Sequence, residues 1–191
     1  MAQKETKLDK LMGGLFLMSI FTTVWTILAE FYFKNADSRI LGIAFGLIII
    51  YFIYSFWNFT VKRANLPETK EDTDPKRERL FWIILTTEGV AILVAKNVLV
   101  NIGQDQLFIA SLALIVGLHF IPLAKVFKRK FDYYIGSWTI VCAITGIVLI
   151  LQKQYDYHTV NAFVCTACAF STSVYGLNMI SNGKKILAAK D

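Results

Sequence analysis

Six long apolar stretches constrain this chain more than any other feature of its sequence. Each contains about 20 mostly apolar residues, and at a rise of about 1.5 Å per residue a helix of that length crosses the roughly 30 Å hydrocarbon core of a membrane. The stretches occupy residues 11–33, 40–61, 80–100, 107–126, 133–151 and 159–180. The sequence therefore predicts an all-α, polytopic integral membrane protein with six transmembrane helices in one bundle that covers residues 1–191.

Composition agrees with this fold class and excludes others. Hydrophobic residues make up 55% of the chain and charged residues only 18%, which is too apolar for an ordinary soluble domain. The net charge is +6, but the basic residues cluster at the ends of the apolar stretches, where they would meet lipid headgroups. We therefore expect the lipid bilayer as the surroundings of the chain, and no nucleic-acid partner.

The distribution of Lys and Arg predicts the orientation in the membrane. Sixteen of them lie in the N-terminal segment, in residues 62–79 and 125–130, and in the C-terminal tail, whereas only Lys34, Arg39 and Lys153 lie in the connections on the other side. Because positively charged short loops stay in the cytoplasm, both termini and the 62–79 loop are predicted to be cytoplasmic. The connections on the opposite side are short, which favours three antiparallel hairpins.

Glu88 is the strongest candidate for a functional residue. It lies eight residues into the third stretch, about 12 Å from the cytoplasmic end of that stretch and near the middle of the membrane. Inserting a charge at that depth costs about 2.5–3.5 kcal/mol, so the carboxyl group must be neutral, paired or beside water. Glu88 could hold or release a proton, or bind a cation; the alternative is a structural hydrogen bond between helices.

His119 in the fourth stretch is predicted to lie at the same depth as Glu88. The two residues are equally far along the chain from the middle of the connection between their stretches. If their side chains face each other, they would form a coupled titrating pair suited to proton relay. The alternative is a histidine that hydrogen-bonds a neighbouring helix, and the sequence leaves both open. Pro122 removes a helical hydrogen bond to the carbonyl of Leu118 and could bend this helix.

Two neighbouring residues of the third stretch, Lys96 and Asn97, are further candidates for a polar pathway. Lys96 lies about 7.5 Å from the outer end of the stretch, so its long side chain can reach the headgroups. A role as a counter-ion or anion contact is the alternative. Lys96 is eight residues from Glu88, about 12 Å along one helix, so the two cannot pair directly.

Two stripes of polar or small side chains recur at helical spacing. In the first stretch they include Thr26 and Glu30, which are also candidates for the pathway. In the sixth stretch they include Cys165 and Cys168, and Cys142 in the fifth stretch matches the depth of Cys168. Such stripes favour close helix packing, with a polar pathway as the alternative. The three thiols could bind a soft metal, but small buried cysteines are the better interpretation, so we expect no metal and no cofactor.

One part of the chain, in the third and fourth stretches, combines several short motifs. Residues 86–127 read TTEGVAILVAKNVLVNIGQDQLFIASLALIVGLHFIPLAKVF, with a Glu88-Gly89 pair, a Gly-Leu-His-Phe run at 117–120 and Pro-Leu-Ala at 122–124. This part of the chain resembles uncharacterised small six-helix bacterial inner-membrane proteins. The resemblance implies a multi-pass protein of the inner (plasma) membrane, and it implies no activity.

Three functional hypotheses follow. The first is a proton- or cation-coupled transporter or channel-like protein that uses Glu88 and His119, whose small ion or solute is unknown and which would need to form a homo-oligomer to enclose a route. The alternative is a non-catalytic membrane interaction, stress or immunity factor. An intramembrane enzyme acting on lipid or quinone comes third, because the chain contains none of the short motifs of soluble-type catalysis.

Overall fold

The predicted six helices are confirmed by the computed structural model, which describes residues 6–34, 39–64, 66 and 75–189. Within these residues there is no strand. All six helices are long and apolar enough to cross a membrane. Their bounds are α1 (Lys7–Phe33), α2 (Ile40–Arg63), α3 (Pro75–Asn101), α4 (Phe108–Phe127), α5 (Lys130–Leu151) and α6 (Tyr157–Ala188), with a short 3-10 helix η1 (Asp105–Leu107) before α4.

Helices α1, α3 and α6 extend furthest beyond the predicted spans into polar sequence. Helix α1 begins earlier than residue 11 because Thr6 and Asp9 form a capping box over its first turn. Helix α3 begins at Pro75 rather than near residue 80, and proline suits a first helical position because its missing N–H has no helical partner there. Helix α6 continues to Ala188. Half of the predicted 62–79 loop lies outside the described residues, and its described half belongs mostly to α2 and α3.

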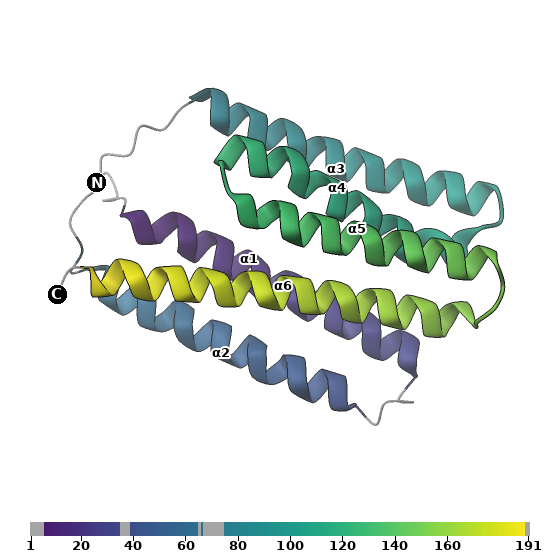
Figure 1. Cartoon of the computed structure of the whole chain (residues 1–191), viewed down its shortest axis with the longest axis horizontal. Helices are drawn as coiled ribbons and strands as arrows, with labels where there is room; N and C mark the ends of the chain where they lie inside the picture. The colour runs from purple at the N-terminus through teal and green to yellow at the C-terminus, as the bar shows by residue number, and fades with distance from the viewer. Residues whose placement is uncertain (1–5, 35–38, 65, 67–74, 190–191) are drawn as a thin grey trace.

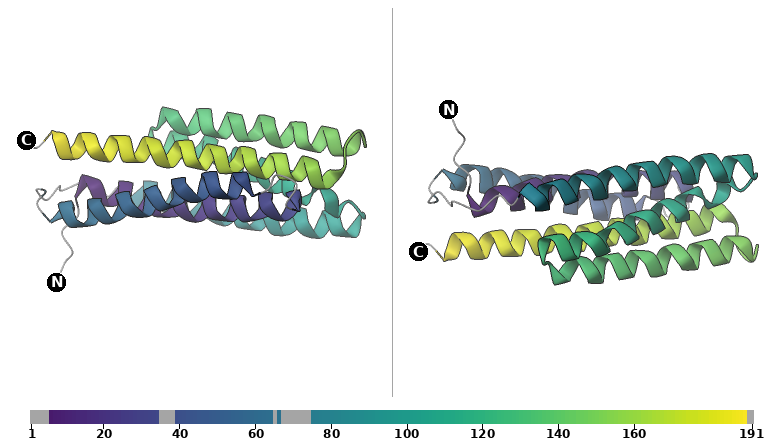
Figure 2. Two further views of the ribbon diagram at one scale, coloured as in Figure 1. Left: turned by 90° about the horizontal axis from the view of Figure 1, so that it is seen from below. Right: turned by 90° about the horizontal axis from the view of Figure 1, so that it is seen from above.

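Helix α6 is at the centre of the bundle. It contacts α1, α2, α4 and α5, and its contact with α1 is the most extensive in the molecule. Viewed edge-on, α1 and α2 lie in one layer and α5 and α6 in a second (Figure 2). Helix α1 begins and helix α6 ends at the same end of the bundle (Figure 1). We call this the terminal end.

Helix α3 is the peripheral member of the bundle. It lies at the edge opposite α2 (Figure 1), and its main packing partner is α4. None of its side chains is fully buried, whereas α6 has many buried residues. The attachment of α3 therefore depends on few contacts, and the α3–α4 interface is where Glu88 and His119 lie.

Helix α4 is held against α5 by two facing glycines. A side chain at Gly136 would place its Cβ 2.9 Å from the carbonyl oxygen of Gly117, and one at Gly117 would meet the backbone nitrogen of Ile140 at 3.0 Å. Small residues let helix backbones approach this closely, which is a common way to join helices in membranes. This contact fixes the rotation of α4 and so decides which of its side chains turn toward α3.

Candidate functional site

Glu88 and His119 meet at the interface of α3 and α4. Glu88 is the central residue of α3, and its Oε1 lies 3.2 Å from Nδ1 of His119. Their side chains are only 13% and 15% exposed, respectively. The two atoms are within ion-pair distance, although the angle is not that of a hydrogen bond. The structure thus brings together the two residues for which the sequence predicts a common depth.

The surroundings of His119 place the pair at the margin of the core. The imidazole ring lies 4.6 Å from the ring of Phe120, centroid to centroid, and Phe120 in turn packs on Tyr175 of the central helix. Helix α4 continues through Pro122 to Phe127 without interruption. One side of the pair is therefore bounded by the apolar interior and the other by the single helix α3.

This arrangement can hold a proton in two ways. With the proton on Glu88, both side chains are neutral; with the proton on His119, they form a carboxylate–imidazolium ion pair. Direct transfer between the two atoms requires a side-chain rotation that turns this contact into a hydrogen bond, and such a transfer leaves the net charge of the pair unchanged. Because the two side chains are in contact, a proton donor or acceptor that reaches one of them would also affect the protonation of the other.

Lys96 and Asn97 are not part of this pair. Both are exposed, and Asn97 Nδ2 donates a hydrogen bond to the carbonyl oxygen of Leu93 at 2.8 Å on its own helix. Lys96 lies two helical turns beyond Glu88, at about 12 Å along the axis. The structure therefore leaves Glu88 with His119 as its partner and places Lys96 nearer the end of α3.

Thr26 and Glu30 hydrogen-bond to the backbone of α1 and α2. Thr26 Oγ1 donates to the carbonyl oxygen of Thr22 at 2.6 Å. Glu30 Oε1 accepts a hydrogen bond from the backbone N–H of Gly42 at 2.6 Å and so caps the first turn of α2. A carboxylate is favourable at this position because the first N–H groups of a helix lack helical partners and carry a partial positive charge. The structure does not bring either residue to Glu88.

Hydroxyl groups join helices α1, α5 and α6 at the middle of the bundle. Thr22 of α1 donates to Thr172 of α6 at 2.9 Å, and Thr139 of α5 lies 3.3 Å from Ser171 of α6, oxygen to oxygen. All four side chains are buried. These hydroxyl groups therefore join α1 and α5 to α6, which is the role that the packing interpretation gives to polar side chains at helix contacts.

The three cysteines carry free thiols on α5 and α6. Cys165 and Cys168 are buried, Cys142 is partly buried, and none forms a disulfide. Among the described residues, no three side chains of His, Cys, Asp or Glu are placed to hold a metal ion. The thiols act here as small side chains in the packing of α5 and α6.

A buried acid outside the predicted spans escaped the sequence analysis. Asp132, in the first turn of α5, accepts a hydrogen bond from the Tyr175 hydroxyl at 2.5 Å on Oδ1 and one from Arg129 Nε at 3.1 Å on Oδ2. Its side chain is 1% exposed. The signal was the pairing of Arg129 with an acid three residues later, but Asp132 directly precedes the fifth apolar stretch and reads there as a surface residue.

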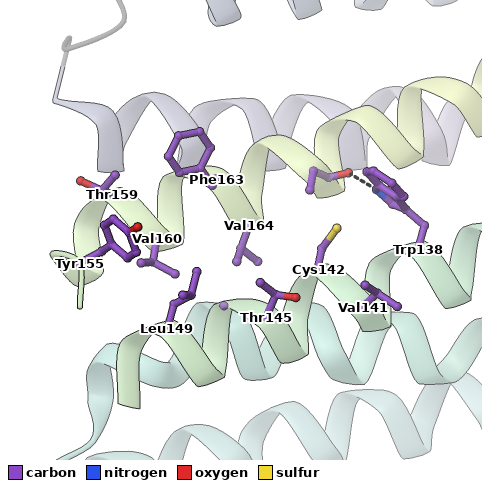
Figure 3. Close-up of a pocket in the computed structure, with 12 residues that line it drawn as sticks. Trp138, Val141, Cys142, Thr145, Leu149, Tyr155, Thr159, Val160, Phe163 and Val164 are labelled. Atoms are coloured by element: carbon purple, nitrogen blue, oxygen red, sulfur yellow. Dashed lines mark hydrogen bonds between the residues drawn. The ribbon is translucent and has the colours of Figure 1, made fainter. Parts of the chain in front are cut away.

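A groove between α5 and α6 opens on the outside of the bundle (Figure 3). Its volume is about 730 Å³ and its lining is almost entirely apolar, with Trp138 at one end and Tyr155 at the other. The indole of Trp138 donates to the carbonyl oxygen of Ala167 at 3.3 Å across the groove. Neither Glu88 nor His119 lines this groove.

The comparisons with known proteins add no family to this description. No family model matches the chain, and neither a curated protein nor a solved structure matches it.

Proposed function

We propose that the six helices cross a bacterial inner membrane as three antiparallel hairpins, with both termini in the cytoplasm. The supporting observations are the six apolar helices, the contacts of α1 with α2, α3 with α4 and α5 with α6, and the excess of Lys and Arg at the terminal end. Large apolar side chains are exposed on every helix, including Trp57, Leu93 and Phe163. Such a surface suits a hydrocarbon solvent and would drive aggregation in water.

Within that membrane, we propose that the protein is a small proton-coupled transporter or channel-like protein whose proton-carrying group is the Glu88–His119 pair. The observation that carries this proposal is the 3.2 Å approach of a carboxylate and an imidazole, both mostly buried, at the centre of α3. Titratable side chains at that depth are expensive and are typical of proton relays. An imidazole ring has one nitrogen that can accept a proton and one that can donate it, which suits a histidine to receive and return the proton.

The proposed protein acts as a homo-oligomer. The pair lies under one peripheral helix, and a route past it requires a second wall beyond α3. The outward side of α3 offers exposed apolar side chains, among them Val90 and Val94, on which a second copy can pack. A symmetric contact of this kind would enclose two pairs, one from each copy.

Proton flux in proteoliposomes tests the proposal. Under an imposed pH gradient, Glu88→Gln and His119→Gln are each expected to abolish the flux of the unmodified protein while leaving the protein folded. Glu78→Gln is the matched control, because it makes the same chemical change at an exposed position of the same helix. Unchanged flux in the Glu88→Gln protein would refute the role of the pair.

A second candidate function is a non-catalytic membrane interaction factor, such as a stress, immunity or assembly protein. The observation that favours it is the use of polar side chains for helix contacts, as in the Thr22–Thr172 bond and the Glu30 cap. On this reading the Glu88–His119 pair only holds α3 against α4. The expected result is then no flux from the unmodified protein or from any variant, a lower abundance of folded Glu88→Gln, and recovery of a defined complex in a pulldown with the unmodified protein.

A further inference from the structure

A second polar site lies at the terminal end of the bundle, where α1, α5 and α6 meet. A groove of about 480 Å³ opens there, and the side chains that face it include Lys10 of α1, Arg129 and Lys130 at the start of α5, and Asn178 and Asn182 of α6. The floor of the groove contains Asp132 and Tyr175. This groove is separate from the apolar groove between α5 and α6 and from the Glu88–His119 pair.

The charges around the groove favour an anion. Three cationic side chains and one carboxylate line it, giving a formal net charge of +2. The carboxylate is already neutralised locally, since Oδ1 of Asp132 accepts from Tyr175 and Oδ2 accepts from Arg129. The first turn of α5, which begins at Lys130, adds the partial positive charge of a helix N-terminus.

Arg129 is held in place rather than left to swing freely. Its Nε is fixed on Asp132, and its guanidinium group stacks on the ring of Phe127 at 4.6 Å. The side chain remains 43% exposed. A guanidinium group has five N–H donors in a planar fork, so the bond to Asp132 leaves donors that suit the oxygen atoms of a phosphate group. The amide groups of Asn178 and Asn182 add neutral donors on the facing wall.

In the membrane topology proposed above, the groove lies at the height of the headgroup layer. Lys10 immediately precedes the first apolar stretch, and Lys130 lies three residues before the fifth. We propose that this groove binds a phosphate group that carries net negative charge, presented by the headgroup of an anionic phospholipid at the cytoplasmic surface. Basic pockets between transmembrane helices on that side are a recognised setting for such headgroups.

The test counts lipids bound to the purified protein by native mass spectrometry, after release from phosphatidylcholine nanodiscs that contain phosphatidylglycerol. Lys10→Gln and Lys130→Gln are each expected to weaken the retention of phosphatidylglycerol about fivefold, because each removes one charge-assisted contact to the phosphate group. Lys130→Arg keeps the charge and is expected to retain the lipid. This variant distinguishes loss of the site from loss of the fold.

Lys185→Gln is the matched control, because it removes one exposed positive charge near the same end of α6 outside the groove. It is expected to change lipid retention less than twofold. Equal losses in all three Gln variants would show diffuse attraction to the surface and would overturn the proposal. So would equal retention of phosphatidylglycerol and phosphatidylcholine by the unmodified protein.

A calorimetric titration with inorganic phosphate, in nanodiscs of phosphatidylcholine alone, identifies the source of the phosphate group. Heat of binding that Lys10→Gln and Lys130→Gln abolish would overturn the lipid assignment in favour of a soluble phosphate compound at the same groove. No binding of inorganic phosphate, together with lysine-dependent retention of phosphatidylglycerol, is the result expected for a headgroup site.

Discussion

The phenyl ring of Phe52 on α2 occupies the space that a side chain at Gly176 on α6 would fill. The same relationship recurs seven residues later on both helices, where a Cβ at Gly183 would stand 2.6 Å from Cζ of Phe59. Both rings are almost completely buried, with exposed fractions of 0% and 1%. Helix α2 is therefore joined to the central helix by two rings that pack into two glycine notches.

Gly176→Ala is expected to destabilise the protein by about 1–3 kcal/mol, because the added methyl group forces a buried ring out of its position. The measurement is the free energy of unfolding in bicelles or mild detergent. Gly46→Ala on α2 is the matched control, since a Cβ there meets nothing within 4 Å. Because alanine is the better helix former, that control is expected to be neutral or slightly stabilising. Equal destabilisation by both variants would contradict the close packing of the Phe52 ring on Gly176.

The Glu88–His119 pair is expected to stabilise the attachment of α3 to α4. In a double-mutant cycle of Glu88→Gln and His119→Gln, we expect a coupling free energy of about 0.5–2 kcal/mol, since the side chains are in direct contact and mostly shielded from water. Hydrogen exchange along α3 provides a second measurement and should increase in both single variants. Strictly additive effects of the two substitutions would contradict the contact.

Tyr175→Phe removes the hydroxyl group that donates to buried Asp132. The expected loss in the free energy of unfolding is about 1.5–3 kcal/mol, the usual range for a hydrogen bond to a charged partner. Tyr134→Phe on α5 is the matched control, because its side chain is 73% exposed. We expect the control to stay within about 0.5 kcal/mol of the unmodified protein. A loss no larger in Tyr175→Phe than in Tyr134→Phe would show that the bond contributes nothing.

Glu30→Ala is expected to destabilise the first turn of α2 by about 0.5–2 kcal/mol, because the backbone N–H of Gly42 loses its acceptor. Glu30→Gln keeps an acceptor oxygen and is expected to lose less. Hydrogen exchange at Gly42 and its neighbours, compared with the middle of α2, measures the effect directly. If proton flux rather than local exchange changed in Glu30→Gln, the cap would not be the main role of this residue.

The sequence predicted the number of helices and most of their ends. The hydrophobicity of an apolar stretch is the sum over its consecutive residues, and the thickness of the hydrocarbon layer sets the length that the stretch must have. Neither the hydrophobicity nor the length depends on how the helices pack. The ends that extend further, at Lys7, Pro75 and Ala188, were underestimated because capping and propensity continue a helix into polar sequence.

The candidate site was predictable only in part. Equal spacing from the connection between α3 and α4 predicted a common depth for Glu88 and His119, because depth along a helix follows from residue number. That they face each other depends on the rotation of each helix about its axis, and the close approach of Gly117 to Gly136 fixes that rotation for α4.

The sequence by itself thus determined how many apolar helices the chain forms and how deep each residue lies along them. The tertiary structure alone decided that Asp132 is buried under Tyr175, that Glu30 caps α2, and that Lys10 and Lys130 share one groove. The physical reason is that hydrophobicity and helical rise are properties of one segment. Whether side chains of different helices contact each other depends instead on how those helices are rotated and packed together.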